Sequence, residues 1–122
     1  QDHDLNSALP FPDNHFDILI SINLIEHLQD ENFFLQECHR VLRPGGKLAL
    51  TTANLNFILH DKFYDKTHIH EWSLGTFKNM CSKYFIETLS EKSSSMFNFY
   101  PLNFLTTLIL KPDLLFIGKK DV

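Results

Sequence analysis

Two short polar stretches carry the residues of this sequence that are best suited to chemistry. Residues 21–27 hold Glu26 and His27 side by side, and residues 54–71 form a histidine-rich stretch that includes His68. Carboxylate and imidazole groups can bind divalent metal ions, and they can also accept or donate protons during catalysis. These side chains are therefore the first candidates for a functional site.

Each polar stretch follows an apolar run that has the length of a strand. Residues 16–22 are almost continuously apolar, which is typical of a strand buried on both faces of a parallel sheet. Residues 47–52 form the second expected strand. Between them, residues 30–42 have helical spacing with Asp30 as the N-cap, and Pro-Gly-Gly at residues 44–46 ends the helix. This order predicts a right-handed parallel crossover unit.

The predicted crossover unit also predicts where a ligand would bind. Open parallel sheets bind ligands beyond the carboxyl ends of their strands, and residues 21–27 and 52–56 lie at those ends. Ordinary loop chemistry explains both stretches about equally well, because a fold alone does not imply a function.

The remainder of the chain predicts further α/β structure. Ser73 is the expected N-cap of a second helix, and residues 85–90 and 114–118 are expected strands. Residues 91–95 are an expected loop, and residues 96–110 are either a short helix or a lid.

The composition is that of one small globular domain. The chain has 122 residues, of which 43% are hydrophobic and 21% are charged. A net charge of −4 disfavours a nucleic-acid partner. No apolar stretch is long enough to span a bilayer and no signal peptide is recognisable, so a cytoplasmic location is expected. Cys38 and Cys81 lack metal or redox spacing, so we expect reduced core thiols. The oligomeric state is left open.

Three motifs resemble one family when they are taken together. In chain order they are Leu-Pro-Phe-Pro-Asp-Asn-x-Phe-Asp at residues 9–17, Ile-Glu-His-Leu at residues 25–28 and Arg-Val-Leu-Arg-Pro-Gly-Gly-Lys-Leu at residues 40–48. They resemble class I S-adenosylmethionine-dependent methyltransferases of the kind found in ubiquinone and menaquinone biosynthesis. The resemblance is tight over residues 4–54 and looser afterwards.

The resemblance implies a fold and a reaction. It implies methyl transfer from S-adenosylmethionine to a small-molecule acceptor, an EC 2.1.1 activity, on an α/β, Rossmann-like sheet. Residues 1–122 would be the C-terminal part of a single methyltransferase domain and would carry strands four to seven with their intervening helices. The family's glycine-rich loop and ribose-binding acid would belong upstream of Gln1. The N-terminal half is then expected to be absent, and the isolated fragment inactive.

The resemblance also implies cofactor-binding residues. The matching positions are Asp4, Leu5, Ser21, Ile22 and Asn23. Asp4 would accept a hydrogen bond from the adenine amino group, and the backbone N–H of Leu5 would contact the ring. The carbonyl groups of residues 21–23 would accept the ammonium group of the methionine moiety. The alternative for Asp4 is a solvated loop residue.

His68 is the candidate catalytic residue. It falls where the family places substrate-side residues, and an imidazole there can act as a general base. A solvated loop residue is the alternative.

Asn23, Glu26, His27 and His68 also resemble a metal site of small-RNA 2'-O-methyltransferases that is built from Glu, Glu, His and His. Asn23 replaces the first carboxylate of that site, and Glu-His pairs also occur in metal-free relatives. The sequence therefore assigns no metal ligands, and a metal-assisted O-methyltransferase remains an alternative.

A second alternative comes from a different class of function. The chain could be a non-catalytic remnant or a binding module that keeps the methyltransferase fold. A nicotinamide-dependent dehydrogenase would share the sheet, but it has no use for the first two motifs. Whether the methyl acceptor is an oxygen, nitrogen or carbon atom is left open by the sequence.

Overall fold

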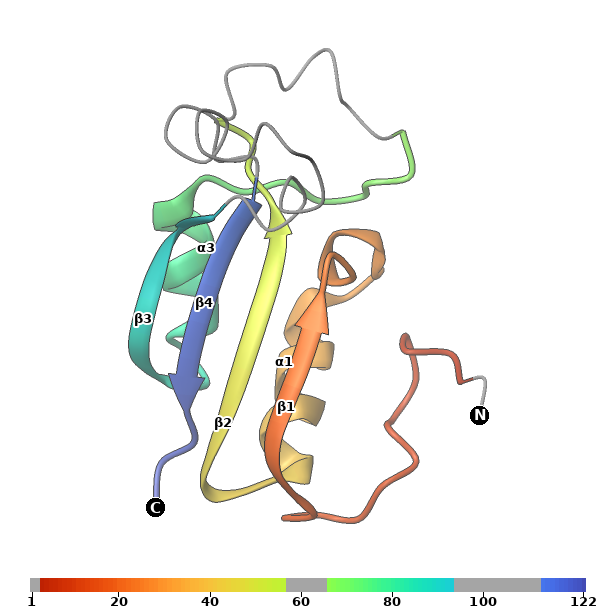
Figure 1. The fold of residues 1–122 in the computed structure, drawn as a ribbon. Coiled ribbons are helices and arrows are strands. Elements are labelled where there is room, and N and C mark those ends of the chain that lie inside the picture. The colour runs from red at the N-terminus through yellow and green to blue at the C-terminus, as the bar shows by residue number, and fades with distance from the viewer. Residues whose placement is uncertain (1–2, 57–65, 94–112) are drawn as a thin grey trace, which may run out of the picture.

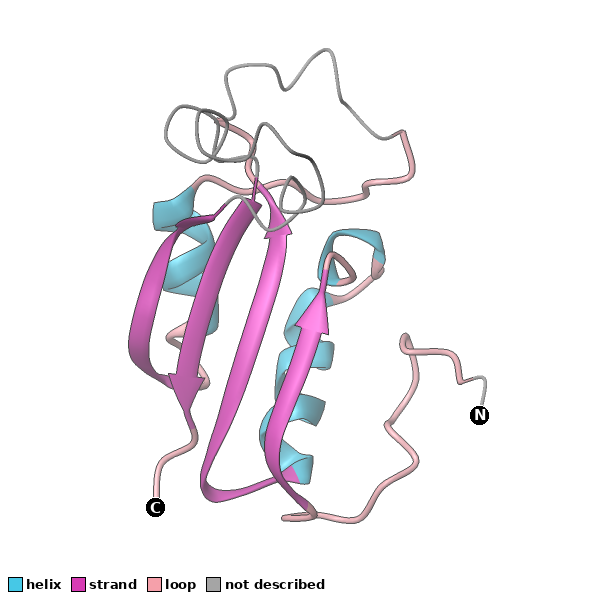
Figure 2. Cartoon of the chain, viewed as in Figure 1, coloured by secondary structure: helices cyan, strands magenta, loops and turns pink. Residues whose placement is uncertain are grey.

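A four-stranded sheet with α-helices on one face is the frame of this computed structural model, which describes residues 3–56, 66–93 and 113–122 (Figures 1 and 2). The strands are β1 (Phe16–Ile22), β2 (Leu42–Ala53), β3 (Ile86–Ser93) and β4 (Asp113–Lys119). The helices are α1 (Glu31–Val41), α3 (Leu74–Cys81) and a single 3-10 turn, η1 (Ile25–His27). The strand order is β1-β2-β4-β3; β1 is parallel to β2, and β4 is antiparallel to both of its neighbours. The predicted α/β class and the parallel strand–helix–strand unit are confirmed.

Both α-helices begin at the residues expected from the sequence. The Asp30 carboxylate accepts a hydrogen bond from the backbone N–H of Phe33 at 2.9 Å, and the Ser73 hydroxyl accepts one from Thr76 at 3.3 Å. Each cap satisfies one of the N–H groups that a helix start leaves without an intrahelical partner. α1 ends one residue before the expected end, because Leu42 already has extended backbone angles.

β2 is longer than predicted. It begins at Leu42 and takes in the Pro-Gly-Gly turn, which we expected to lie between helix and strand. Leu42 pairs with Phe16 of β1, and the backbone of Gly46 accepts a hydrogen bond from the N–H of Lys120 at 2.9 Å. β3 also extends to Ser93, through residues expected to form a loop, because β4 supplies a partner along that whole length.

The expectation that β1 is buried on both faces is wrong. Ile18, Ile20 and Ile22 are 61%, 66% and 65% exposed, whereas Ser21 on the opposite face is buried. β1 lies at the edge of the sheet, and α1 and α3 both pack against the other face (Figure 1). No described residue covers the isoleucine face of β1, so its apolar pattern reflects a surface rather than a core.

The core lies between the helices and the covered face of the sheet. Its side chains come from η1, α1, β2, α3 and β4, with Leu35, Leu48, Leu50, Phe77 and Phe116 fully buried. Cys38 and Cys81 are buried there as predicted, and burial raises the pKa of each thiol to about 12.

Gly118 of β4 packs tightly into this core. A Cβ atom at this position would lie 2.5 Å from the ring of Phe116 and 2.7 Å from the Cβ of Phe85. The closeness of these two aromatic residues therefore excludes any side chain at residue 118.

Residues 96–110, the expected helix or lid, fall outside the described residues. Within the described part of the chain, no helix has both the length and the apolar character needed to cross a membrane.

Candidate functional site

A groove of about 510 Å³ runs along the outer edge of β1. Its floor is the strand itself. Its other walls come from the N-terminal segment with Leu5, Leu9 and Phe11, from Leu24 after β1, and from Phe34 of α1. Figure 1 shows the N-terminal segment running beside β1 at the open edge of the sheet. The lining is mainly apolar, as in most small-molecule sites.

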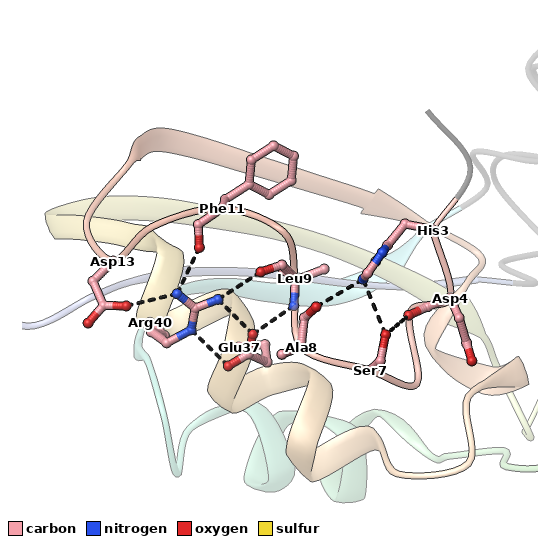
Figure 3. Close-up of polar contacts among 9 residues, drawn as sticks. All are labelled: His3, Asp4, Ser7, Ala8, Leu9, Phe11, Asp13, Glu37 and Arg40. Atoms are coloured by element: carbon pink, nitrogen blue, oxygen red, sulfur yellow. Dashed lines mark hydrogen bonds and ion pairs between the residues drawn. The ribbon is translucent and has the colours of Figure 1, made fainter.

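Arg40 of α1 fixes the N-terminal wall of the groove (Figure 3). Its guanidinium donates two hydrogen bonds to the Glu37 carboxylate, at 2.8 and 2.7 Å, and one to Asp13 at 2.8 Å. It also donates to the backbone carbonyls of Phe11 and Leu9, at 2.8 and 3.0 Å. One side chain therefore holds residues 9–13 against α1.

Glu37 completes this arrangement. Its carboxylate accepts a hydrogen bond from the backbone N–H of Leu9 at 2.8 Å in addition to those from Arg40. The Arg40 bonds hold the pKa of the buried Glu37 carboxyl below its usual value, and the same pair raises the pKa of Arg40. The sequence placed Arg40 only in the last turn of a helix. The one signal that could have suggested more is its spacing of three residues from Glu37.

The groove brings together four of the five residues matched to cofactor binding. Leu5, Ser21, Ile22 and Asn23 all line it. The hydroxyl oxygen of Ser21 is buried and has no hydrogen-bond partner among the described residues. Buried polar atoms are almost always paired, so the Ser21 hydroxyl is an exception among the described residues.

Asp4 lies outside the groove lining and is exposed. One oxygen of its carboxylate accepts hydrogen bonds from the backbone N–H and the side-chain amide of Asn6, at 3.0 and 3.1 Å. The backbone bond is the main reason that the pKa of Asp4 is lowered. These bonds stabilise the turn that contains Asp4, which Figure 3 shows together with Ser7 and Leu9.

The residue that follows β1 has a left-handed backbone conformation. Asn23 has a φ of 46°, and its backbone N–H donates to the carbonyl of Thr51 at 3.1 Å. Its side-chain oxygen accepts a hydrogen bond from the Thr51 hydroxyl at 3.2 Å. Asparagine tolerates this conformation better than most residues, so the chain can turn sharply here from strand into η1.

A second candidate site, which is polar, lies directly after this turn. Glu26, His27 and His68 each offer one possible ligand atom, and these atoms all lie within 4.8 Å of one another. The Glu26 carboxylate accepts a hydrogen bond from the Thr52 hydroxyl at 2.9 Å, which places the cluster at the carboxyl end of β2. The backbone carbonyl of Glu26 accepts hydrogen bonds from Ile69 and His70, at 2.8 and 3.2 Å, and these bonds bring His68 to the cluster.

The other candidates in the histidine-rich stretch lie elsewhere. His70 is half-buried rather than solvated; its ring lies 3.3 Å from the carboxylate of Glu31 and stacks on Trp72. Tyr64 and Asp65, which belong to the same stretch, fall outside the described residues.

Comparisons with known proteins agree with these motifs. Residues 2–50 match the family model described as a methyltransferase domain. A probable S-adenosylmethionine-dependent methyltransferase of Mycolicibacterium smegmatis is 46% identical over 48 residues, which are 39% of this chain and 19% of that protein. A ubiquinone/menaquinone biosynthesis C-methyltransferase of a Shewanella species is 51% identical over 59 residues, 48% of this chain and 24% of that protein. The matched segments thus span about a fifth to a quarter of these relatives.

The fold likeness extends further than the sequence likeness. A solved S-adenosylmethionine-dependent methyltransferase of Thermotoga maritima, described as a possible histamine N-methyltransferase, superposes with a TM-score of 0.73 at 19% identity. That likeness covers 98% of this chain and 62% of the other. The chain is therefore similar in sequence to S-adenosylmethionine-dependent methyltransferases near its start, and similar in its α/β fold to a solved member of that group.

Proposed function

We propose that this chain belongs to an enzyme that transfers a methyl group from S-adenosylmethionine to a small-molecule acceptor. The observation that carries the proposal is the groove along β1, because four of the residues matched to cofactor binding line it. The sequence relatives support the same cofactor and reaction. Bound S-adenosylmethionine would supply an electrophilic methyl group.

The groove residues fit part of such a cofactor. Leu5 and the other apolar side chains offer a surface for a flat adenine ring, and the buried hydroxyl of Ser21 offers a hydrogen bond to a polar atom. The carbonyl groups at the end of β1 are the proposed acceptors for an ammonium group. Asp4 would accept a hydrogen bond from the adenine amino group through its carboxylate. One oxygen of that carboxylate already accepts two hydrogen bonds from Asn6.

The four glycines of the chain lie at residues 45, 46, 75 and 118, so no glycine-rich loop precedes β1 in this sequence. We propose that the chain represents strands four to seven of the family's sheet and that it is inactive by itself. It should then bind the cofactor with a dissociation constant of about 1 mM or weaker, a binding free energy of roughly −4 kcal/mol.

The acceptor would lie at the carboxyl ends of β1 and β2, beside His68. Two roles are open to the His68 imidazole there: it can accept a proton from the acceptor, or it can help to bind a metal ion. Alignment of donor and acceptor supplies much of the rate in such a transfer, so the first role is not required.

Titration with S-adenosylhomocysteine, the stable demethylated product, tests the proposal. Chemical-shift changes should concentrate on the backbone amides of Leu5, Ser21 and Asn23, and should stay small around His39 on the far side of α1. Shift changes centred elsewhere would contradict the cofactor groove. Binding without turnover in a protein that includes a glycine-rich loop would favour the non-catalytic alternative.

A further inference from the structure

We propose that Glu26, His27 and His68 bind a divalent first-row transition metal ion such as Zn²⁺. One carboxylate and two imidazoles form a donor set that suits such ions, whereas Mg²⁺ and Ca²⁺ prefer oxygen ligands alone. The possible ligand atoms lie within 4.8 Å of one another, and the two imidazole ring centroids are 4.9 Å apart. This site does not depend on the proposed methyl transfer.

The orientation of both imidazoles supports the metal site. Nδ1 of His27 lies 3.2 Å from the backbone carbonyl of Thr67, and Nδ1 of His68 lies 3.5 Å from a carboxylate oxygen of Glu71. The His68–Glu71 contact is not a hydrogen bond, so Nδ1 of His68 is buried without a hydrogen-bond partner among the described residues. Metal-binding histidines typically have a carbonyl or carboxylate group beside the ring nitrogen that does not bind the metal, and both rings have such a neighbour here.

The charge of Glu26 supports a cation at the same place. The residue is 1% exposed, and its carboxylate accepts a hydrogen bond from the neutral Thr52 hydroxyl. Among the described residues, no lysine or arginine forms an ion pair with it. A buried carboxylate without a cationic partner is strongly disfavoured, and a bound metal ion would neutralise it.

The backbone already holds the ligands from the two segments together. The carbonyl of Glu26 is bonded to the N–H groups of Ile69 and His70, so no long loop has to close when the ion binds. Ligand atoms around a tetrahedral zinc lie about 3.4 Å apart, so small side-chain rotations complete the site. Three protein ligands leave at least one position for water or another ligand, as in catalytic rather than structural zinc sites.

Metal titration of the 122-residue protein tests this proposal. Calorimetry with Zn²⁺, and absorption spectroscopy with Co²⁺ as a coloured probe, should show about one ion bound per chain. Glu71→Gln should weaken binding by roughly 10- to 100-fold because it removes the negative charge beside the His68 ring. Glu26→Gln and His68→Gln remove ligands and should weaken binding by more than that. His39→Gln is the matched control: it removes a histidine outside the cluster and should leave the affinity unchanged.

The outcomes separate a built site from scattered histidine binding. Equal Zn²⁺ affinity in the wild type and in His68→Gln would overturn the proposal, as would a comparable loss in His39→Gln or competition by equimolar Mg²⁺. Circular dichroism checks the fold of each variant, and should Glu26→Gln fail to fold, the half-buried His68 decides the question. No cofactor enters the experiment, so its failure is distinguishable from a failure of the proposed function.

Discussion

The groove along β1 and the Glu26–His27–His68 cluster lie only a few residues apart in the chain, yet they are built in opposite ways. The groove is mainly apolar, and its N-terminal wall is fixed by Arg40, a side chain outside its lining. The cluster is polar, and it is held by backbone bonds to one of its own members, Glu26. A substitution at Arg40 can therefore loosen the groove without changing a residue that lines it. The cluster, in contrast, is changed by substituting its own residues or the residues that contact them directly.

Arg40→Met is expected to have the largest effect and to separate the two regions. It removes the hydrogen bonds that Arg40 donates to the Glu37 carboxylate and to two backbone carbonyls, which should lower the free energy of unfolding by about 2–4 kcal/mol. Urea denaturation measures this change. Metal binding at the cluster should persist under native conditions.

Arg43→Met is the control for this variant. Arg43 pairs with Asp17 at an exposed position, so its loss should cost less than about 1 kcal/mol. Similar costs for the two arginines would show that Arg40 has no special role in holding the wall.

Two adjacent threonines sharpen the comparison, because each serves one region. The Thr52 hydroxyl donates to Glu26 of the cluster, and the Thr51 hydroxyl donates to Asn23 at the groove. Thr52→Val should lower the free energy of unfolding of the metal-free chain by about 1–3 kcal/mol, and it should also weaken Zn²⁺ binding. Thr51→Val should cost about 0.5–1.5 kcal/mol and leave Zn²⁺ binding unchanged. A change in Zn²⁺ affinity in Thr51→Val would show that the regions are coupled.

The acid dependence of stability should report on the groove wall. Arg40 lowers the pKa of Glu37 in the folded protein, so the contribution of Glu37 is fully present above its unfolded-state value, near 4.5. That contribution is lost as the pH falls through the lower folded-state pKa. Urea denaturation at several pH values between about 3 and 7 should show a steeper acid loss in the wild type than in Glu37→Gln. Parallel curves would contradict the role given to the pair.

The smallest effect is expected on the open face of β1. Ile20 is exposed, so Ile20→Thr should change the free energy of unfolding by no more than about 0.5 kcal/mol. Leu50→Ala, at a fully buried position of the neighbouring strand, should cost about 2–5 kcal/mol. Thermal unfolding compares the two variants. A large loss in Ile20→Thr would mean that this face is covered in solution.

Sequence patterns predicted the parts of the structure that depend on neighbouring residues. Asp30 and Ser73 cap helices through bonds to residues three positions later, and the apolar run of β1 marks its ends correctly. Four of the residues matched to cofactor binding through the family resemblance lie together at the groove. Their cofactor-binding roles remain predictions.

The features that depend on distant segments could not be predicted. Burial of Ile18 and Ile20 depends on what lies opposite the strand, and the pattern of apolar residues carries no information about that. The role of Arg40 depends on residues 9–13 returning to α1. The strand-end rule suggested that His68 lies near Glu26. The contact between Nδ1 of His68 and the carboxylate of Glu71 could be found only from the structure.

The place of β4 in the sheet has a consequence for how the chain folds. β4 is the last strand in the sequence, yet it lies between β2 and β3, and Phe116 fills the core while Gly118 admits the neighbouring aromatic rings. A ribosome releases β1, α1 and β2 first, so this local unit can form early. β3 has no described strand to pair with until residues 113–119 emerge. Half of the sheet must therefore wait until residues 113–119 have been made, and a chain cut before residue 113 would lack the strand with which β3 pairs.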